Sequence, residues 1–499
     1  MAGIGIKLNK IYSRNSIITG IAGAFYSTVV TVAPMVVIML CVFLMELVLG
    51  FSKISYSTRE LFSCSILYVF IFSLCTAAPF NSVISRYLSD IIYDEKLEDI
   101  LPCFYTGLIM NVVFSAIVGI PFYVHEYVVG EVDFMYVFVS YCAYMSLMLI
   151  FYSMLYLSIC KDYTKITVFY ALGMVVAFCL AWVFNKIFGM EVTFSMLLAL
   201  AIGFFLIAAL EMGQIKDYFK DNSGNYKGVL EYFKKYWQLV IANFGYTLGL
   251  YMHNFVFWTT DLHIIVVKSY VCCEPFDMAT YLAMLTSISC TVIFISNVER
   301  RFHERYKDYS EAVIGGKLSE IARCELRMFR QLSFELMNIA RTQFIITVVV
   351  FLAVVVLLPL YGMSGLVMQI YPCLAAAYFV IFIMYGAIVF LYYYNDLNGA
   401  AATSVIFMVV NLVVSIFATK LNTTYYGLGA FVGAVAGFSV AFSRLRWVER
   451  NIERHIFCVG TLIPHGQGER PDSVVYSNAK RRKLIAANTE KDLSYKYDL

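Results

Sequence analysis

Five residues that could bind a ligand gather where the seventh apolar stretch of the chain ends and the eighth begins. His253, Asn254 and Trp258 fall within about two helical turns, and Asp277 and Tyr281 begin the next stretch. Their imidazole, amide, indole, carboxylate and phenol groups can hydrogen-bond to hydroxyls, and aromatic rings can stack on the face of a sugar. We therefore predict that these five side chains contact a substrate.

A further candidate for substrate binding is Glu46, late in the first apolar stretch. An ionisable group inside a membrane span is a functional candidate because its charge is costly to bury. For Glu46, an interfacial carboxylate that reaches water and a substrate-binding or ion-coupling role fit the position equally well. Glu211 and Arg86 lie at inner ends of spans, where we expect their long side chains to extend to water.

No pattern of catalytic residues accompanies these candidates. The chain has no GxxxxGK[ST], HExxH or GxSxG motif and no paired carboxylates at catalytic spacing. Its 13 cysteines include no CxxC pair and no Cys/His spacing suited to zinc. We therefore expect no enzyme activity, no cofactor and no metal. Cys272 and Cys273, in an outer loop, could pair with another chain or with each other, but a structural role is favoured.

Composition indicates that membrane-spanning helices position these residues. Of the 499 residues, 61% are hydrophobic and only 14% are charged, against about 45–50% and 25% in soluble proteins. This composition excludes a soluble enzyme, a disordered chain and a disulfide-rich secreted domain. The twelve apolar stretches long enough to cross a bilayer are 20–49, 61–85, 104–124, 135–159, 166–188, 193–212, 236–258, 278–297, 344–361, 366–392, 398–418 and 425–442.

The positions of lysine and arginine set the orientation of these spans. With the N-terminus inside, the inner segments hold 32 of the 37 Lys and Arg residues and the outer segments hold 5. Both termini are therefore predicted to be cytoplasmic, which requires an even number of spans. Trp237 and Trp258, 21 residues apart, would anchor the seventh span at the two membrane surfaces. The first span is longer than a signal-peptide core, so we expect it to be retained.

An internal repeat divides the chain into two halves. Residues 96–100 read KLEDI and residues 317–321 read KLSEI, an offset of 221. This is close to the offset of about 219 between the start of the first span, near Ile17, and the start of the seventh, near Tyr236. The repeat predicts an all-α integral membrane protein with twelve transmembrane helices in two parallel six-helix bundles. The predicted divisions are an N-terminal bundle at 1–212, a cytoplasmic linker at 213–235, a C-terminal bundle at 236–442 and a cytoplasmic tail at 443–499.

A long basic segment, 299–341, interrupts the C-terminal half on the cytoplasmic side. Its apolar residues recur at spacings compatible with an amphipathic helix. Such a helix could lie on anionic lipid or dock a cytoplasmic enzyme. The residues predicted to dock a partner or lipid are Arg300, Arg301, Arg305, Arg323, Arg327 and Arg330. The basic run at 480–483 is typical of a solvated or lipid-attracted segment rather than a nucleic-acid patch.

The charges missing from the spans narrow the substrate class. A transporter of pyrophosphate-linked sugars needs buried Arg or Lys to pair with phosphate. An ion-driven drug exporter needs a carboxylate in mid-membrane. Neither is evident in the sequence, whereas a cavity of amides, hydroxyls and many of the 38 tyrosines suits a neutral, hydroxyl-rich substrate.

Short motifs along the chain resemble the PelG family of exopolysaccharide transporters. The resemblance rests on the opening Met1–Gly5 before a basic segment, on Ser85–Asp90 with Leu101–Pro102 beyond it, and on Asp277, Tyr281–Ala283, Glu299, Phe302, Tyr306 and Gly315–Gly316. These motifs follow the family's order from residue 1 to about 457. Ile6 and Lys7 depart from the family pattern, and the tail beyond about 457 resembles an extension.

The resemblance implies a transporter of the multidrug/oligosaccharidyl-lipid/polysaccharide flippase superfamily, with a MATE-like pair of bundles around a central cavity in the bacterial cytoplasmic membrane. It also implies export of Pel, an N-acetylgalactosamine-rich polymer, made by a cytosolic PelF-like glycosyltransferase. PelD-like and PelE-like membrane partners, with cyclic-di-GMP control, would complete the assembly. No nucleic-acid partner is expected.

Two other functions stay open at this point. One is a flippase of lipid-linked oligosaccharide, or a cation-coupled small-molecule exporter, with the same fold. The other is a membrane scaffold that recruits the glycosyltransferase through residues 299–341 and the tail while transporting nothing.

Overall fold

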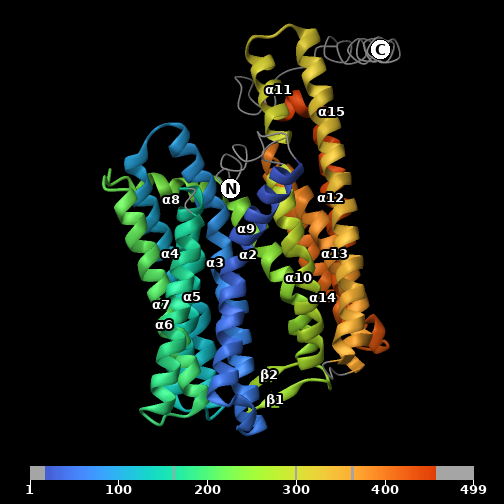
Figure 1. Ribbon diagram of the computed structural model, residues 1–499. Coiled ribbons are helices and arrows are strands. Elements are labelled where there is room, and N and C mark those ends of the chain that lie inside the picture. Colours follow the sequence, from blue (N-terminus) through green and yellow to red (C-terminus); the bar gives the residue numbers. More distant parts are fainter. Residues whose placement is uncertain (1–16, 161–162, 298–300, 361–364, 457–499) are drawn as a thin grey trace. The chain divides into compact units, whose positions relative to one another are not determined.

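A computed structural model of the chain describes residues 17–160, 163–297, 301–360 and 365–456 (Figure 1). The chain divides into two compact units. The first comprises Met1–Ser296 and Ile339–Leu445, and the second comprises Asn297–Asn338 and Arg446–Leu499. Both predicted halves contribute helices to the first unit.

Six long helices come from the N-terminal half of the chain. They are α2 (Ile17–Leu49), α3 (Tyr56–Tyr93), α4 (Ile100–Val128), α5 (Phe134–Ile159), α6 (Tyr163–Lys186) and α7 (Val192–Tyr218). Side-chain caps fix two of their starts. Ser55 Oγ accepts from the Thr58 backbone N–H at 3.3 Å before α3, and Asp133 accepts from the Met135 N–H at 3.0 Å before α5.

The C-terminal half supplies six more long helices. They are α9 (Trp237–Phe257), α10 (Glu274–Asn297), α12 (Leu318–Leu360), α13 (Gly365–Tyr393), α14 (Leu397–Ala418) and α15 (Leu428–Ile456). Asp396 caps α14 by accepting from the Gly399 N–H at 3.1 Å. The same carboxylate accepts two hydrogen bonds from Arg444 of α15, at 2.8 and 2.9 Å, which joins the start of α14 to α15.

Nine helices in the described ranges are long and apolar enough to cross a membrane. The chain is therefore a multi-pass, nearly all-helical membrane protein. Helix α9 is not among the nine because Asn243, His253 and Asn254 interrupt its apolar sequence. Every predicted apolar stretch coincides with a helix, while the count of twelve spans in two bundles stays a prediction.

A short β-hairpin connects α9 to α10. Strands β1 (Ile264–Val266) and β2 (Tyr270–Cys272) are antiparallel, with Ile265 opposite Val271. Figure 1 shows this hairpin at one end of the helices of the first unit and the short helix α8 (Tyr226–Lys235) at the other end. Because α8 belongs to the predicted cytoplasmic linker, the hairpin lies on the predicted extracytoplasmic side.

Helix α3 connects the two halves of the chain within the first unit. Helices α5, α6 and α7 pack together, α3 and α4 pack on α5, α2 packs on α6, and α9 packs on α14. Helix α3 also packs along α9. This α3–α9 contact, which we term the seam, positions the candidate site.

The second unit contains α11 (His303–Gly315) and the first part of α12. Helix α11 ends at a pair of glycines, Gly315 and Gly316, because glycine has low helix propensity. Helix α12 then runs for 43 residues, and the first proline within it is Pro359. The segment 299–341 is therefore not a single separate helix: it divides at the glycines, and its second part continues directly into the predicted ninth span.

Candidate functional site

Asp277, in the first turn of α10, is the centre of a buried hydrogen-bond network. Its Oδ1 accepts from Asn254 Nδ2 at 2.7 Å, and both carboxylate oxygens accept from Trp258 Nε1 at 3.0 Å. Oδ2 also accepts from the Cys273 backbone N–H at 3.0 Å. The helix N-terminus and these donors stabilise the carboxylate, which is only 5% exposed. Three of the predicted site residues thus form one network.

The other three predicted substrate-binding residues lie elsewhere. His253 is fully buried, and its Nδ1 lies 3.3 Å from Asn411 Nδ2 of α14. Tyr281, one turn beyond Asp277 on α10, is 39% exposed. Glu46 is partly exposed on α2, and the hydrogen bonds among the described residues do not join it to the network. The substrate-binding role of all six residues stays a prediction.

Aromatic rings fill the outer end of the seam. The Tyr68 ring of α3 lies 4.8 Å from the Trp258 ring of α9 and stacks on the Tyr270 ring of β2 at 5.6 Å, measured between ring centres. One turn further along α3, Phe72 stacks on Phe255 of α9 at 6.0 Å. Aromatic pairs contribute about 0.5–1.5 kcal/mol each beyond the area they bury. The carboxylate network therefore holds an indole that itself packs against the other half of the chain.

The β1–β2 hairpin, which we term the outer latch, is hydrogen-bonded to helices of the N-terminal half. The Tyr68 hydroxyl donates to the Val271 carbonyl and accepts from the Val271 N–H, the latter at 3.2 Å. Ser269 donates to the buried Glu126 carboxylate of α4. A Cβ at Gly130 would collide with Ser269 Oγ, so this close approach requires glycine. The outer latch thus contacts both α3 and the end of α4.

The seam continues to the inner end of α3 and α9. Asn243 Nδ2 of α9 donates to the Ala78 carbonyl of α3 at 2.5 Å, which joins the two helices. The Arg86 guanidinium lies 4.2 Å from the ring centre of Tyr236, in a cation–π contact. Arg86 is partly exposed, so its side chain contacts this ring at the start of α9 while part of it stays accessible to water, as expected.

Glu211 of α7 differs from its expected placement. It is fully buried, and its Oε2 accepts from Ser153 Oγ of α5 at 2.6 Å. Its Oε1 has no hydrogen-bond partner among the described residues. The expectation that it extends to water is wrong because Glu211 faces α5, against which α7 packs. The N-terminal half therefore holds an interior carboxylate that the sequence did not make evident.

The buried charged residues of the described ranges share one sign. They are Asp99, Glu126, Glu211, Asp277, Glu335 and Asp396. Among the side chains whose exposure the structure describes, no lysine or arginine is buried.

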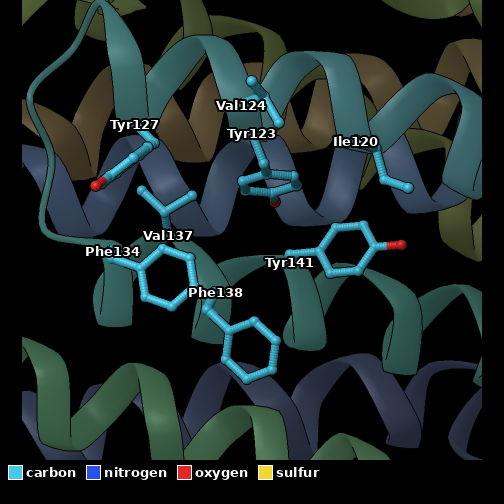
Figure 2. Close-up of a pocket in the computed structure, with 8 residues that line it drawn as sticks. All are labelled: Ile120, Tyr123, Val124, Tyr127, Phe134, Val137, Phe138 and Tyr141. Atoms are coloured by element: carbon cyan, nitrogen blue, oxygen red, sulfur yellow. The ribbon is translucent and has the colours of Figure 1, made fainter.

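A groove of about 180 Å³ lies between α4 and α5, away from the seam. Figure 2 shows its lining, which is Ile120, Tyr123, Val124 and Tyr127 of α4 and Phe134, Val137, Phe138 and Tyr141 of α5. Phe134 and Phe138 are 55% and 51% exposed. Such exposed apolar rings are expected on a membrane protein surface that contacts acyl chains, so we do not assign the groove to the substrate.

The arginines predicted to dock a partner belong to the second unit. Arg300 lies outside the described residues. The other five, Arg301, Arg305, Arg323, Arg327 and Arg330, are all exposed. The last three follow one another at spacings of four and three on α12, so they share one helix face. Their docking role stays a prediction.

Cys272 and Cys273 are both buried and are not in disulfides. Burial raises the pKa of the Cys273 thiol to about 12, so that thiol stays protonated at neutral pH. The Cys272 thiol lies close enough to the Cys64 thiol of α3 for an electrostatic interaction. Burial also raises the pKa of the neighbouring Tyr270 phenol. In the part of the chain that the structure describes, no group of His, Cys, Asp and Glu is arranged to hold a metal.

Comparison with known protein families decides the family of this membrane protein. The family model PelG, described as "Putative exopolysaccharide Exporter (EPS-E)", matches residues 1–457. The chain belongs to the PelG family. This is a family of exporters and not of enzymes. Among curated proteins, none matches the sequence of this PelG-family chain.

Solved structures of MATE transporters share the fold of this PelG-family chain. A mutant of the Vibrio cholerae MATE transporter VcmN has a TM-score of 0.57 at 11% identity, covering 87% of this chain and 98% of its own. VcmN in its bent form has a TM-score of 0.55 at 12% identity, with the same coverage of both chains. An outward-facing multidrug resistance MATE transporter of the MOP superfamily has a TM-score of 0.51 at 12% identity, covering 86% of this chain and 96% of its own. This likeness shows a MATE-like fold.

Sequence reasoning missed most of the side chains that form the seam of this PelG-family chain. Tyr68 and Phe72 lie four residues apart on one face of α3, and Phe255 lies three residues before Trp258. That spacing was the available signal. With 38 tyrosines and 41 phenylalanines in the chain, the spacing recurs too often to single out these residues.

Proposed function

We propose that this PelG-family chain exports a neutral, N-acetylhexosamine-rich exopolysaccharide similar to Pel. The polymer would cross the bacterial cytoplasmic membrane between the two halves of a twelve-span protein, with both termini in the cytoplasm. The family match supports exopolysaccharide export. The MATE-like fold supports passage between two bundles, since repeat-built transporters bind substrate between their repeats.

One observation carries the choice of a neutral sugar polymer: the seam offers aromatic rings and amides, and the described interior holds no buried cation. Tyr68, Phe72, Phe255 and Trp258 present ring faces along the outer seam. Neutral sugars stack on such rings and exchange hydrogen bonds with phenols and amides. A phosphate-linked substrate would instead need Arg or Lys at the seam.

The aromatic pairs also explain how the path can close when no polymer is present. In the described structure, Tyr68 packs on Trp258 and Phe72 packs on Phe255, so ring faces of the two halves cover each other. A polymer can enter only if these pairs separate. The lost ring contacts are offset when sugar faces stack on the same rings. We therefore assign the pairs two roles, as a gate and as a binding surface.

The proposed exporter takes its driving force from a partner, because the chain carries no nucleotide-binding motif. A cytosolic PelF-like glycosyltransferase would push the growing polymer, with PelD-like and PelE-like membrane proteins completing the assembly. The arginine face of α12, which comprises Arg323, Arg327 and Arg330, suits an acidic protein surface. Charge reversal of these three should abolish co-purification of the glycosyltransferase, whereas reversal of Lys186 and Lys268 should leave it unchanged.

Reconstitution tests the proposed export directly. Inside-out vesicles containing the chain and its glycosyltransferase would receive a nucleotide sugar, and polymer would then be challenged with added glycosidase. Export predicts polymer protected inside the vesicles. Polymer that is fully digested while the glycosyltransferase remains bound would favour the scaffold function instead.

A cation-coupled exporter is the second candidate, and Glu211 favours it. This fully buried carboxylate has one oxygen paired with Ser153 and one without a described partner. A buried carboxylate of this kind can bind and release a proton during transport. Coupling would be supported if export is lost when the ion gradient is collapsed. It would also require that Glu211→Gln or Glu46→Gln is equally inactive with the gradient intact. Export that persists in both variants without a gradient would exclude it.

A further inference from the structure

The outer latch carries a thiol that lies beside a thiol of the other half of the chain. Cys272 is the last residue of β2, and Cys64 lies on α3, one turn before Tyr68. The two thiols lie close enough for an electrostatic interaction, and β2 packs on α3. Tyr68 bonds both the carbonyl and the N–H of Val271, the residue before Cys272. Strand β2 is thus fixed against α3 at the point where the thiols meet.

The neighbouring cysteine differs in its surroundings. The Cys273 N–H donates to Asp277 at 3.0 Å, which ties that residue to α10. Burial raises the pKa of its thiol to about 12. Cys64 and Cys272 are 1% and 4% exposed, so they meet in a protected contact between the latch and α3 rather than at a surface. Cys273 therefore provides an internal control for the pair.

We propose that Cys64 and Cys272 form a disulfide that fastens the outer latch to α3. The latch lies at the end of the first unit opposite α8 (Figure 1), which is the extracytoplasmic, oxidising side in the proposed orientation. The oxidant is an extracytoplasmic protein disulfide. One cysteine thiolate attacks it to give a mixed disulfide, and the second cysteine then displaces the partner's thiol. The pair loses two protons and two electrons, and the partner's disulfide becomes a dithiol.

The bond would hold the gate shut. Tyr270 of the same strand stacks on Tyr68, and Tyr68 packs on Trp258. A covalent link from Cys272 to α3 keeps these rings together, so the disulfide form is the locked state and the dithiol form is the state able to export. This consequence rests on the proposed export function, whereas formation of the bond does not.

Thiol mapping on the full chain in membranes tests the bond. Membranes would be treated with oxidised glutathione or with dithiothreitol, free thiols would be alkylated with N-ethylmaleimide under denaturing conditions, and peptides would be identified by mass spectrometry. We expect a linked Cys64–Cys272 peptide after oxidation, its loss after reduction and in Cys64→Ser, and its persistence in Cys273→Ser. Oxidised wild-type chain with both cysteines still alkylated, or with Cys272 linked to Cys273 or to a second copy, would overturn the proposal.

Transport by the same samples tests the lock. In the vesicle assay, oxidation should cause loss of polymer export by the wild-type chain, and dithiothreitol should restore it. Cys64→Ser should export equally under both conditions. Equal export by oxidised and reduced wild-type chain would overturn the lock. Thiol mapping needs no polymer, so its failure is distinguishable from failure of the export function.

Discussion

The Tyr68 ring on α3 lies 4.8 Å from the Trp258 ring on α9, so one aromatic pair joins the two halves of the chain at the outer end of the seam. Each ring is anchored by hydrogen bonds. The Tyr68 hydroxyl bonds the Val271 backbone, and the Trp258 indole donates to Asp277. The pair therefore has a defined geometry that single substitutions can alter one contact at a time.

Trp258→Ala and Tyr281→Ala should each impair polymer export while leaving membrane insertion intact. Both remove an aromatic surface that we assign to sugar binding, and neither changes a charge. The measurement is secreted polymer per cell, normalised to the amount of the chain in membranes. Trp182→Ala, on the 45% exposed surface of α6, is the matched control and should export normally. Normal secretion by both site variants would contradict the assignment of Trp258 and Tyr281 to substrate binding.

Asp277→Ala should destabilise the protein, because it leaves the Trp258 indole N–H and the Asn254 amide without their buried acceptor. An unsatisfied buried donor costs about 1–3 kcal/mol, so the melting temperature in detergent should fall. Asp261→Ala, at an exposed position, should melt like the wild-type protein. Equal melting temperatures for the two variants would show that the network contributes little to stability.

Arg444→Met should destabilise the α14–α15 contact, since it leaves the Asp396 carboxylate, 2% exposed, without its cation. Removing one partner of a buried ion pair costs about 3–5 kcal/mol. We expect a smaller cost here because the Arg444 side chain is 35% exposed. The double variant Asp396→Asn/Arg444→Met should lose less stability than the sum of the losses measured for the two single variants. Additive losses in a thermal double-mutant cycle would contradict a direct interaction.

Gly130→Ala should loosen the outer latch, because the added Cβ collides with Ser269 Oγ. Displacement of Ser269 would release Cys272 from its protected contact with α3. The readout is the rate at which N-ethylmaleimide alkylates Cys272 in native membranes, which should rise in Gly130→Ala. Gly213→Ala places its Cβ in open space and serves as the control. An unchanged alkylation rate in Gly130→Ala would show that the outer latch does not depend on the close contact between Gly130 and Ser269.

The positions of the helices could be predicted because apolar stretches and the distribution of Lys and Arg are local signals. Some helix ends could not be predicted from hydropathy. Helix α12 continues past the expected boundary at residue 344, since a helix can cross the membrane surface where no Gly or Pro ends it. Glu211 was misplaced for a related reason: its position near a helix end suggested water, but its face of α7 packs on α5.

The candidate site could be predicted only in part. The proximity of Asn254, Trp258 and Asp277 could be predicted because they lie at the end of one helix and the start of the next, and the β1–β2 hairpin between these helices returns the chain to the same end. Tyr68 contacts Val271, 203 residues away. No local pattern predicts such a contact, because it depends on how α3 packs against the hairpin in the folded chain.

The most direct test of this account asks whether the polymer passes through the seam. Phe72→Cys and Phe255→Cys, combined in a chain without other cysteines, would be joined by a cleavable thiol cross-linker in vesicles that contain the glycosyltransferase. We predict that polymer made by cross-linked vesicles is fully digested by added glycosidase, and that cleaving the cross-link restores protected polymer. Equal protection with the cross-link intact would contradict passage between α3 and α9.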